Sequence, residues 1–136
     1  MGSRTVKVTA QDDGAGGIDF DLDGVKPQQA VLKLDKDSGN HSIAFQLNDR
    51  TGRGLEFHPD DPIWIEEDCP CPPSQGINSD QITVTARNKN RLETDNANSG
   101  RARQLRYQLN FIASDGSRAE CDPIIANGGG IKPPAG

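Results

Sequence analysis

Hydrophobic residues alternate with polar residues along most of the chain. The longest such run covers residues 105–113, where Leu105, Tyr107, Leu109, Phe111 and Ala113 share one side. A period of two is typical of strands with one buried and one wet face, which belong to antiparallel sheets. Further runs are Val6 and Val8; Ile18, Phe20 and Leu22; Leu32 and Leu34; Ile43, Phe45 and Leu47; Leu55 and Phe57; Ile63 and Ile65; and Ile82, Val84 and Ala86. About eight short strands predict an all-β, two-sheet antiparallel sandwich.

Turn-forming residues separate these runs. The pair Asp115-Gly116 stands between two apolar stretches and predicts a hairpin. Residues 88–100 are polar and Asn-rich, so we expect a long hairpin loop or a mobile excursion there. Residues 66–76 contain three prolines, which indicates another loop. No segment has the pattern of an amphipathic helix. We expect a single domain over residues 1–126 and a flexible Gly/Pro tail over residues 127–136.

Charge and length narrow the function classes. The chain has 136 residues and a formal net charge of -5. This balance argues against a nucleic-acid-binding protein, which usually carries a basic patch. No apolar run approaches membrane-spanning length, and the N-terminal segment lacks the apolar region of a secretory signal. The sequence therefore predicts a soluble, cytoplasmic protein with neither nucleic acid nor membrane as a partner.

The string Cys69-Pro70-Cys71-Pro72-Pro73 is the most unusual in the chain. Its two thiols could bind a soft metal together with Cys121 and a histidine, His58 or His41, because thiolate and imidazole groups complete tetrahedral sites. Either thiol could instead form a disulfide with Cys121. The spacing differs from the C-x-x-C of structural zinc sites, so we favour a proline-stiffened loop with unbridged thiols. We expect no metal and no cofactor.

Two other groups of residues suggest functional hypotheses. Residues 19–24 match the start of a calcium-binding EF-hand loop, but Ala30 stands where the loop needs a bidentate Glu. His58, Asp60 or Asp61, and Ser74 could be imagined as a hydrolytic set, yet no serine lies on a nucleophile elbow. We expect a non-enzymatic protein, with the alternative of an enzyme whose residues converge only in three dimensions.

Trp64 lies between Ile63 and Ile65 and therefore points to the opposite face of its strand. An aromatic residue on the wet face of a sheet can mark a contact surface. The alternative is that the following proline loop covers it within the same chain. The favoured hypothesis is a docking surface for a protein or a second subunit, formed by Trp64 with Cys69, Pro70, Cys71, Pro72 and Pro73.

The segment LRYQLNFIASDGSRAECDPIIANGG, with HSIAFQLND and FHPDDPIWI before it, resembles small bacterial β-sandwich proteins of the DP-EP family. Asp122-Pro123 after the hairpin and Asn127 at the end of the last strand carry this resemblance. The chain is more remotely similar to inclusion-body proteins of the AidA/PixA type, which also end in a Tyr/Phe-rich strand and an Asp-Pro element. The resemblance implies an immunoglobulin-like sandwich and a bacterial origin, and it implies no activity.

Overall fold

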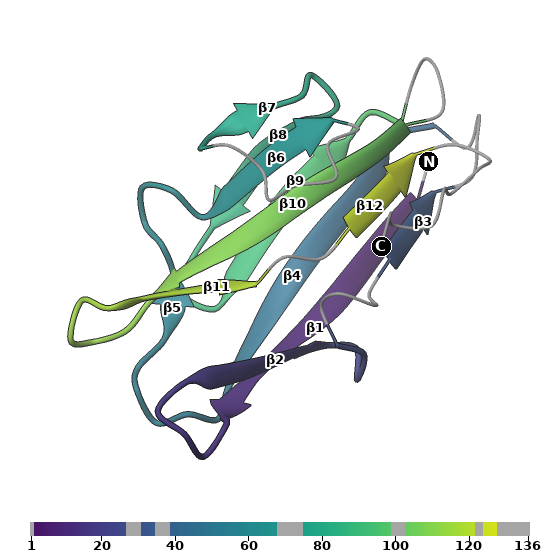
Figure 1. Ribbon diagram of the computed structural model, residues 1–136. Helices are drawn as coiled ribbons and strands as arrows, with labels where there is room; N and C mark the ends of the chain where they lie inside the picture. Colours follow the sequence, from purple (N-terminus) through teal and green to yellow (C-terminus); the bar gives the residue numbers. More distant parts are fainter. Residues whose placement is uncertain are drawn as a thin grey trace.

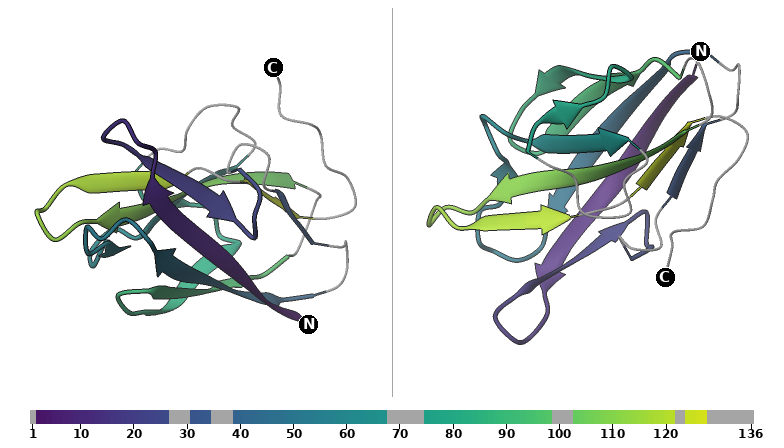
Figure 2. Two further views of the ribbon diagram at one scale, coloured as in Figure 1. Left: turned by 90° about the horizontal axis from the view of Figure 1, so that it is seen from below. Right: turned by 45° about the horizontal axis from the view of Figure 1, so that its top comes forward.

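The first of two stacked β-sheets has five strands (Figure 1; Figure 2, left). The computed structural model describes residues 2–26, 31–34, 39–67, 75–98, 103–121 and 124–127. The strand order in this sheet is β2-β1-β4-β9-β8. These strands are β1 (Gly2–Asp12), β2 (Ile18–Leu22), β4 (His41–Asp49), β8 (Ile82–Arg87) and β9 (Arg91–Asn96). β2 is thus an edge strand of this sheet in the described part of the chain.

The second sheet is organised around β10 (Arg103–Ile112). Its order is β3-β12-β10-β6-β7, and β5 and β11 also pair with β10. The additional strands are β3 (Val31–Leu34), β5 (Glu56–Phe57), β6 (Ile63–Glu67), β7 (Ile77–Asn78), β11 (Arg118–Cys121) and β12 (Ile124–Asn127). β11 pairs with the last four residues of β10 and β12 with the first four, so both lie on the same side of β10.

The predicted two-sheet sandwich is confirmed, with a difference in strand direction. β1 and β4, β12 and β3, and β6 and β7 pair in parallel, whereas the other pairs are antiparallel. β1 uses one edge for its local hairpin with β2. Its other edge pairs with β4, which the chain reaches only after crossing to the opposite sheet through β3. Such a crossover connection delivers a strand in the same direction as its partner.

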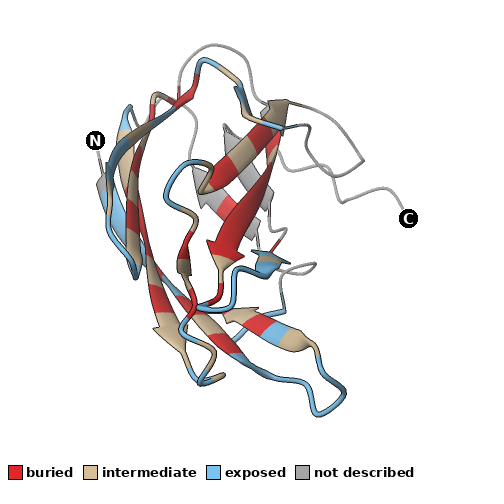
Figure 3. Ribbon diagram, turned by 90° about the vertical axis from the view of Figure 1, so that its left-hand side faces the viewer, coloured by how far each residue is buried: buried red, intermediate tan, exposed pale blue. Residues whose placement is uncertain are grey.

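The core lies between the sheets and contains the alternating residues (Figure 3). Phe45, Tyr107, Leu109 and Phe111 are completely buried, as predicted. The Phe111 ring stacks on Phe20 from the other sheet at a centroid distance of 5.3 Å. The alternation fails on β8, where Val84 is half-buried and Ala86 is exposed. A register shift between these two residues, typical of a β-bulge, turns the later side chains away from the core.

The loop predicted over residues 88–100 is wrong. β9 runs through its middle and pairs with β4 on one side and β8 on the other. Its inward residues are Leu92, Thr94 and Asn96, all buried. Thr94 Oγ1 donates to the Ile43 carbonyl at 2.8 Å, and Asn96 Oδ1 accepts from the Asn98 amide at 2.9 Å. Hydrogen bonds therefore replace apolar contacts on this face, and a polar inward face leaves no hydrophobic alternation in the sequence.

The hairpin predicted at Asp115-Gly116 is confirmed as the connection between β10 and β11. The Ala113 amide donates to the Ser117 carbonyl, and Gly116 has a φ of 89°. No described residue is helical, and none belongs to a helix long and apolar enough to cross a lipid bilayer. Residues 68–74 of the predicted proline loop and residues 128–136 of the predicted tail lie outside the described residues; Asn127 ends β12.

Candidate partner-binding surface

Trp64 lies on the outer face of the second sheet. Its neighbours Ile63 and Ile65 are buried in the core, whereas Trp64 is half-buried on the opposite side of β6. The indole Nε1–H donates to Asp61 Oδ1 at 2.7 Å. Because Asp61 lies just before β6, a local contact fixes the orientation of the ring. The out-of-phase position predicted for Trp64 is confirmed.

Arg118 reaches this ring from β11. Its guanidinium carbon lies 5.5 Å from the centroid of the Trp64 ring, within the range of a cation–π interaction. Arg118 Nη2 also lies 3.5 Å from Asp61 Oδ2. Asp61 therefore contacts both other side chains, one through each carboxylate oxygen. We call Asp61, Trp64 and Arg118 the Trp64 surface.

Two buried polar residues of β10 lie on the same side of the sheet. Gln108 pairs directly with Trp64, and Gln108 and Asn110 are 2% and 0% exposed. Gln108 Nε2 donates to Asn110 Oδ1 at 2.6 Å, and Asn110 Nδ2 donates to the Asp61 carbonyl at 2.9 Å. Satisfied buried polar networks hold their members in one geometry. This network therefore anchors Asp61 and, through it, the Trp64 surface.

His58 belongs to the turn that precedes the Trp64 surface. Its Nδ1 accepts from the backbone amides of Asp60 and Asp61 at 3.2 and 3.1 Å. That nitrogen therefore stabilises the turn rather than facing a metal position. Cys121 lies on the inner face of β11 and is 2% exposed. Cys69 and Cys71 lie outside the described residues, so the metal site of Cys69, Cys71, Cys121 and His58 stays a prediction.

The described residues contain no group of three or more His, Cys, Asp or Glu side chains placed to hold a metal ion. The acidic string of residues 19–24 forms β2 and its following turn. Asp21 pairs with Lys26 at 3.7 Å, and Asp23 Oδ1 accepts from the Lys7 amide at 2.9 Å. These carboxylates therefore have partners within the β1–β2 hairpin and its continuation.

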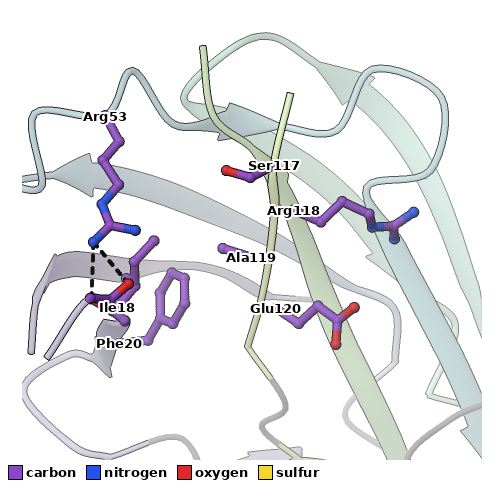
Figure 4. A pocket seen from close by; sticks show the side chains of 9 residues that line it. Ile18, Phe20, Arg53, Ser117, Arg118, Ala119 and Glu120 are labelled. Atoms are coloured by element: carbon purple, nitrogen blue, oxygen red, sulfur yellow. Dashed lines mark hydrogen bonds between the residues drawn. The ribbon is translucent and has the colours of Figure 1, made fainter. Parts of the chain in front are cut away.

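An open groove of about 340 Å³ separates the edge of one sheet from the edge of the other (Figure 4). Residues 16–18 and Phe20 line one side, residues 117–120 of the β10–β11 hairpin line the other, and Arg53 completes the wall. Ser117 and Ala119 point toward Ile18 and Phe20, whereas Arg118 and Glu120 point away from them. We call this feature the β2–β11 groove. Arg118 lies at its rim and also belongs to the Trp64 surface.

Arg53 ties the two hairpins together at one end of the groove. Its Nη2 donates to Asp12 Oδ1 at 2.7 Å and to the carbonyls of Gly16 and Gly17 at 3.3 Å. Its own carbonyl accepts from the amide and the hydroxyl of Ser114, both at 3.0 Å. The residue thus bridges the β1–β2 turn and the β10–β11 turn, which belong to different sheets.

Asp49 shapes the loop that presents Arg53. Its carboxylate accepts from the Thr51 hydroxyl and amide and from the Leu55 amide. Burial opposes ionisation of Asp49, but these hydrogen bonds outweigh it and hold the pKa below its ordinary value of 3.8. The Thr51 hydroxyl accepts in turn from the Arg53 amide at 3.1 Å. A charged Asp49 therefore stabilises the loop conformation that places Arg53.

Ser117 is the hydroxyl-bearing residue among those that line the groove. Its Oγ donates to Asp115 Oδ1 at 2.6 Å, and its amide donates to the same oxygen at 2.9 Å. These two bonds lower the pKa of Asp115. Ser117 therefore serves the β10–β11 turn. Of the hydrolytic set imagined from sequence, His58 serves another turn and Ser74 lies outside the described residues.

Comparison with protein-family models finds no match, and no curated protein matches the sequence. The resemblance to the DP-EP family therefore stays a prediction. Sequence reasoning identified Trp64, considered Asp61 only for a hydrolytic set, and missed Arg118 and the β2–β11 groove. The available signal was the hairpin at Asp115-Gly116, because its register places Arg118 and Glu120 on the outer face.

Proposed function

We propose that this chain is a non-enzymatic, immunoglobulin-like β-sandwich module that binds a protein partner through the Trp64 surface. The observation that carries the proposal is the geometry of Trp64: the ring is half-buried and is held by Asp61 beside it and Arg118 over it. Ordered aromatic and arginine side chains dominate binding energy at protein interfaces. Holding them in place before contact lowers the entropy lost on binding.

Self-association is the first form of binding to test. Wild-type protein and Trp64→Ala are compared by sedimentation velocity and by affinity capture from the source cells. We expect Trp64→Ala to keep most of its thermal stability and to lose self-association or partner capture. Ile77→Ala is the matched control, since Ile77 is an exposed apolar residue on β7 that pairs with Ile65 and therefore lies on the opposite face of the sheet from Trp64. The control should retain all binding.

The competing explanation is that Trp64 serves only the stability of its own chain. In that case Trp64→Ala would lose several kcal/mol of folding free energy, as for a large-to-small core change, and association would be unchanged. That pair of results would refute the proposal. The contribution of Cys69, Pro70, Cys71, Pro72 and Pro73 to the surface, the bacterial origin and the cytoplasmic location stay predictions from the sequence.

A further inference from the structure

The backbone register gives β11 an open edge on the β2–β11 groove. Asn110 directs its amide to the Pro62 carbonyl and its carbonyl to the His58 amide, away from β11. The backbone amide and carbonyl of successive strand residues point to opposite edges of the strand. Those of Leu109 and Phe111 therefore point toward β11 and form hydrogen bonds with the backbones of their partners Cys121 and Ala119. The backbone amides and carbonyls of Arg118 and Glu120 therefore point to the other edge of β11, away from β10. In the described part of the chain β11 pairs with β10 alone.

An open strand edge is a template for another extended backbone. β11 offers two amides and two carbonyls at Arg118 and Glu120, and Ala119 between them points into the groove (Figure 4). We infer that the β2–β11 groove binds an extended peptide segment of a partner protein, which adds to β11 as an antiparallel strand. This inference goes beyond the Trp64 surface: it uses the backbone edge of β11 with Ala119 and Glu120, and it shares Arg118 alone with that surface.

The edge of β11 carries a positive and a negative residue. Arg118 and Glu120 lie two positions apart on this strand, and both side chains point to the face opposite Ile18 and Phe20 (Figure 4). Opposite charges on directly paired residues stabilise adjacent strands, and like charges destabilise them. In an antiparallel strand the residue paired with Glu120 comes first and the residue paired with Arg118 comes last. A complementary segment of three residues therefore has a basic residue first, opposite Glu120, and an acidic residue last, opposite Arg118.

The central residue of the bound segment would point into the groove. It lies opposite Ala119, and side chains of directly opposed residues share one face of the sheet. Ala119 is small, and Ile18 and Phe20 form an apolar wall across the groove. A larger apolar side chain fills this space. The occupant is therefore a basic–apolar–acidic segment such as Lys-Leu-Glu.

A second copy of this chain is the competing occupant. β11 itself reads Arg118-Ala119-Glu120, which matches the charge order. In an antiparallel pair of two β11 strands, however, Ala119 would face Ala119 and leave the apolar wall uncovered. The groove volume of about 340 Å³ therefore favours a segment with a larger central residue.

The test uses the full chain and fluorescein-labelled nine-residue peptides with Gly, Ser and Thr around the central Lys-Leu-Glu. Fluorescence polarisation should show saturable binding. Reversing the charges to Glu-Leu-Lys should weaken binding about tenfold, because two favourable cross-strand pairs become unfavourable. Replacing the central Leu by Ala should weaken it by about the same factor, because apolar contact in the groove is lost.

Backbone methylation separates strand addition from any other mode of binding. The amides of the peptide Lys and Glu face β11, whereas the amide of the central Leu faces away. Methylating the Lys or Glu nitrogen should abolish binding, and methylating the Leu nitrogen should have little effect. Equal effects of the three methylations, or no binding by the unmodified peptide, would overturn the inference.

Protein variants locate the site without relying on the peptides alone. Glu120→Arg should prefer a Glu-Leu-Glu peptide over Lys-Leu-Glu. Trp64→Ala should still bind Lys-Leu-Glu, because the backbone edge of β11, Ala119 and Glu120 remain in place, and a failure of the proposed Trp64 surface is thereby distinguished from a failure of this inference. Circular dichroism checks that each variant is folded. A dimer in sedimentation velocity that Glu120→Pro dissociates, with no peptide binding, would assign the edge to a second copy and overturn the inference.

Discussion

Trp64 and Asp61 are joined by a hydrogen bond of 2.7 Å in which the indole N–H donates to the carboxylate. Because Trp64 is the only tryptophan, the tryptophan fluorescence of the protein reports on the surroundings of this ring. We expect Asp61→Ala to shift the emission to longer wavelength, since the ring loses both its partner and the Arg118 that Asp61 holds over it. The stability loss should be about 1.5–3 kcal/mol, the net value of a hydrogen bond to a charged group.

Asp60→Ala provides the control for this measurement. Asp60 is the exposed neighbour of Asp61, and its backbone amide rather than its side chain contacts His58. Its emission spectrum should match that of the wild type. A shift of the same size in both variants would mean that the turn, rather than the hydrogen bond, positions the ring.

Phe111→Ala should be among the most destabilising single changes. The ring is completely buried and packs on Phe20 at 5.3 Å and on Phe57 at 4.8 Å, so its removal leaves a cavity that spans both sheets. We expect a loss of about 3–5 kcal/mol in a denaturant titration. Ile112→Ala, on the half-buried outer side of the same strand, is the comparison and should cost clearly less. Equal losses would show that the core does not depend on this aromatic contact.

Thr94→Val tests the contribution of the buried polar side chains of β9 to stability. Valine keeps the shape of the side chain but removes the hydroxyl that donates to the Ile43 carbonyl at 2.8 Å. The free energy of unfolding should fall by about 1 kcal/mol. Thr83→Val, at an exposed position on β8, should stay within about 0.5 kcal/mol of the wild type. A more stable Thr94→Val protein would contradict the idea that this bond maintains the strand.

Asp49 should contribute to acid sensitivity. Its pKa is below 3.8 in the folded protein, so the charged form is favoured by folding. The stabilisation is present above the unfolded pKa and is lost as the pH falls from about 5 through the folded value. In urea titrations across this range, Asp49→Asn should lose less stability than the wild type. The stability of Asp49→Asn should still decrease at low pH, but by less, since the pKa values of Asp13 and Asp115 are also lowered. An unchanged pH profile would contradict the role of Asp49.

The two-layer architecture and most of the core could be predicted from the sequence. Where inward residues are large and apolar, as in β4, β6 and β10, the period of two is visible and the burial follows it. β9 escaped prediction because its inward residues are Leu92, Thr94 and Asn96, two of which satisfy their polar groups inside the protein. No local pattern distinguishes such a strand from a polar loop.

The candidate surface could be predicted only in part. The position of Trp64 between two core residues reveals its outward direction. The contact between Trp64 and Arg118 depends on the order β6-β10-β11, which joins strands distant in the chain. The β2–β11 groove depends in addition on the meeting of two sheet edges at Arg53. These relations arise from strand pairing and are not encoded in any short stretch of sequence.

The parallel pairing of β1 with β4 has a consequence for how the chain folds. β1 is synthesised first and can form only its hairpin with β2 until β4 has been made. The second sheet cannot form until β10 is present, because β5, β6, β11 and β12 all pair with it. Non-local pairing slows folding, since loops must close before contacts form. Productive folding must therefore wait until β10 has left the ribosome, and a nascent chain that stops before β10 should remain unfolded and exposed to proteolysis.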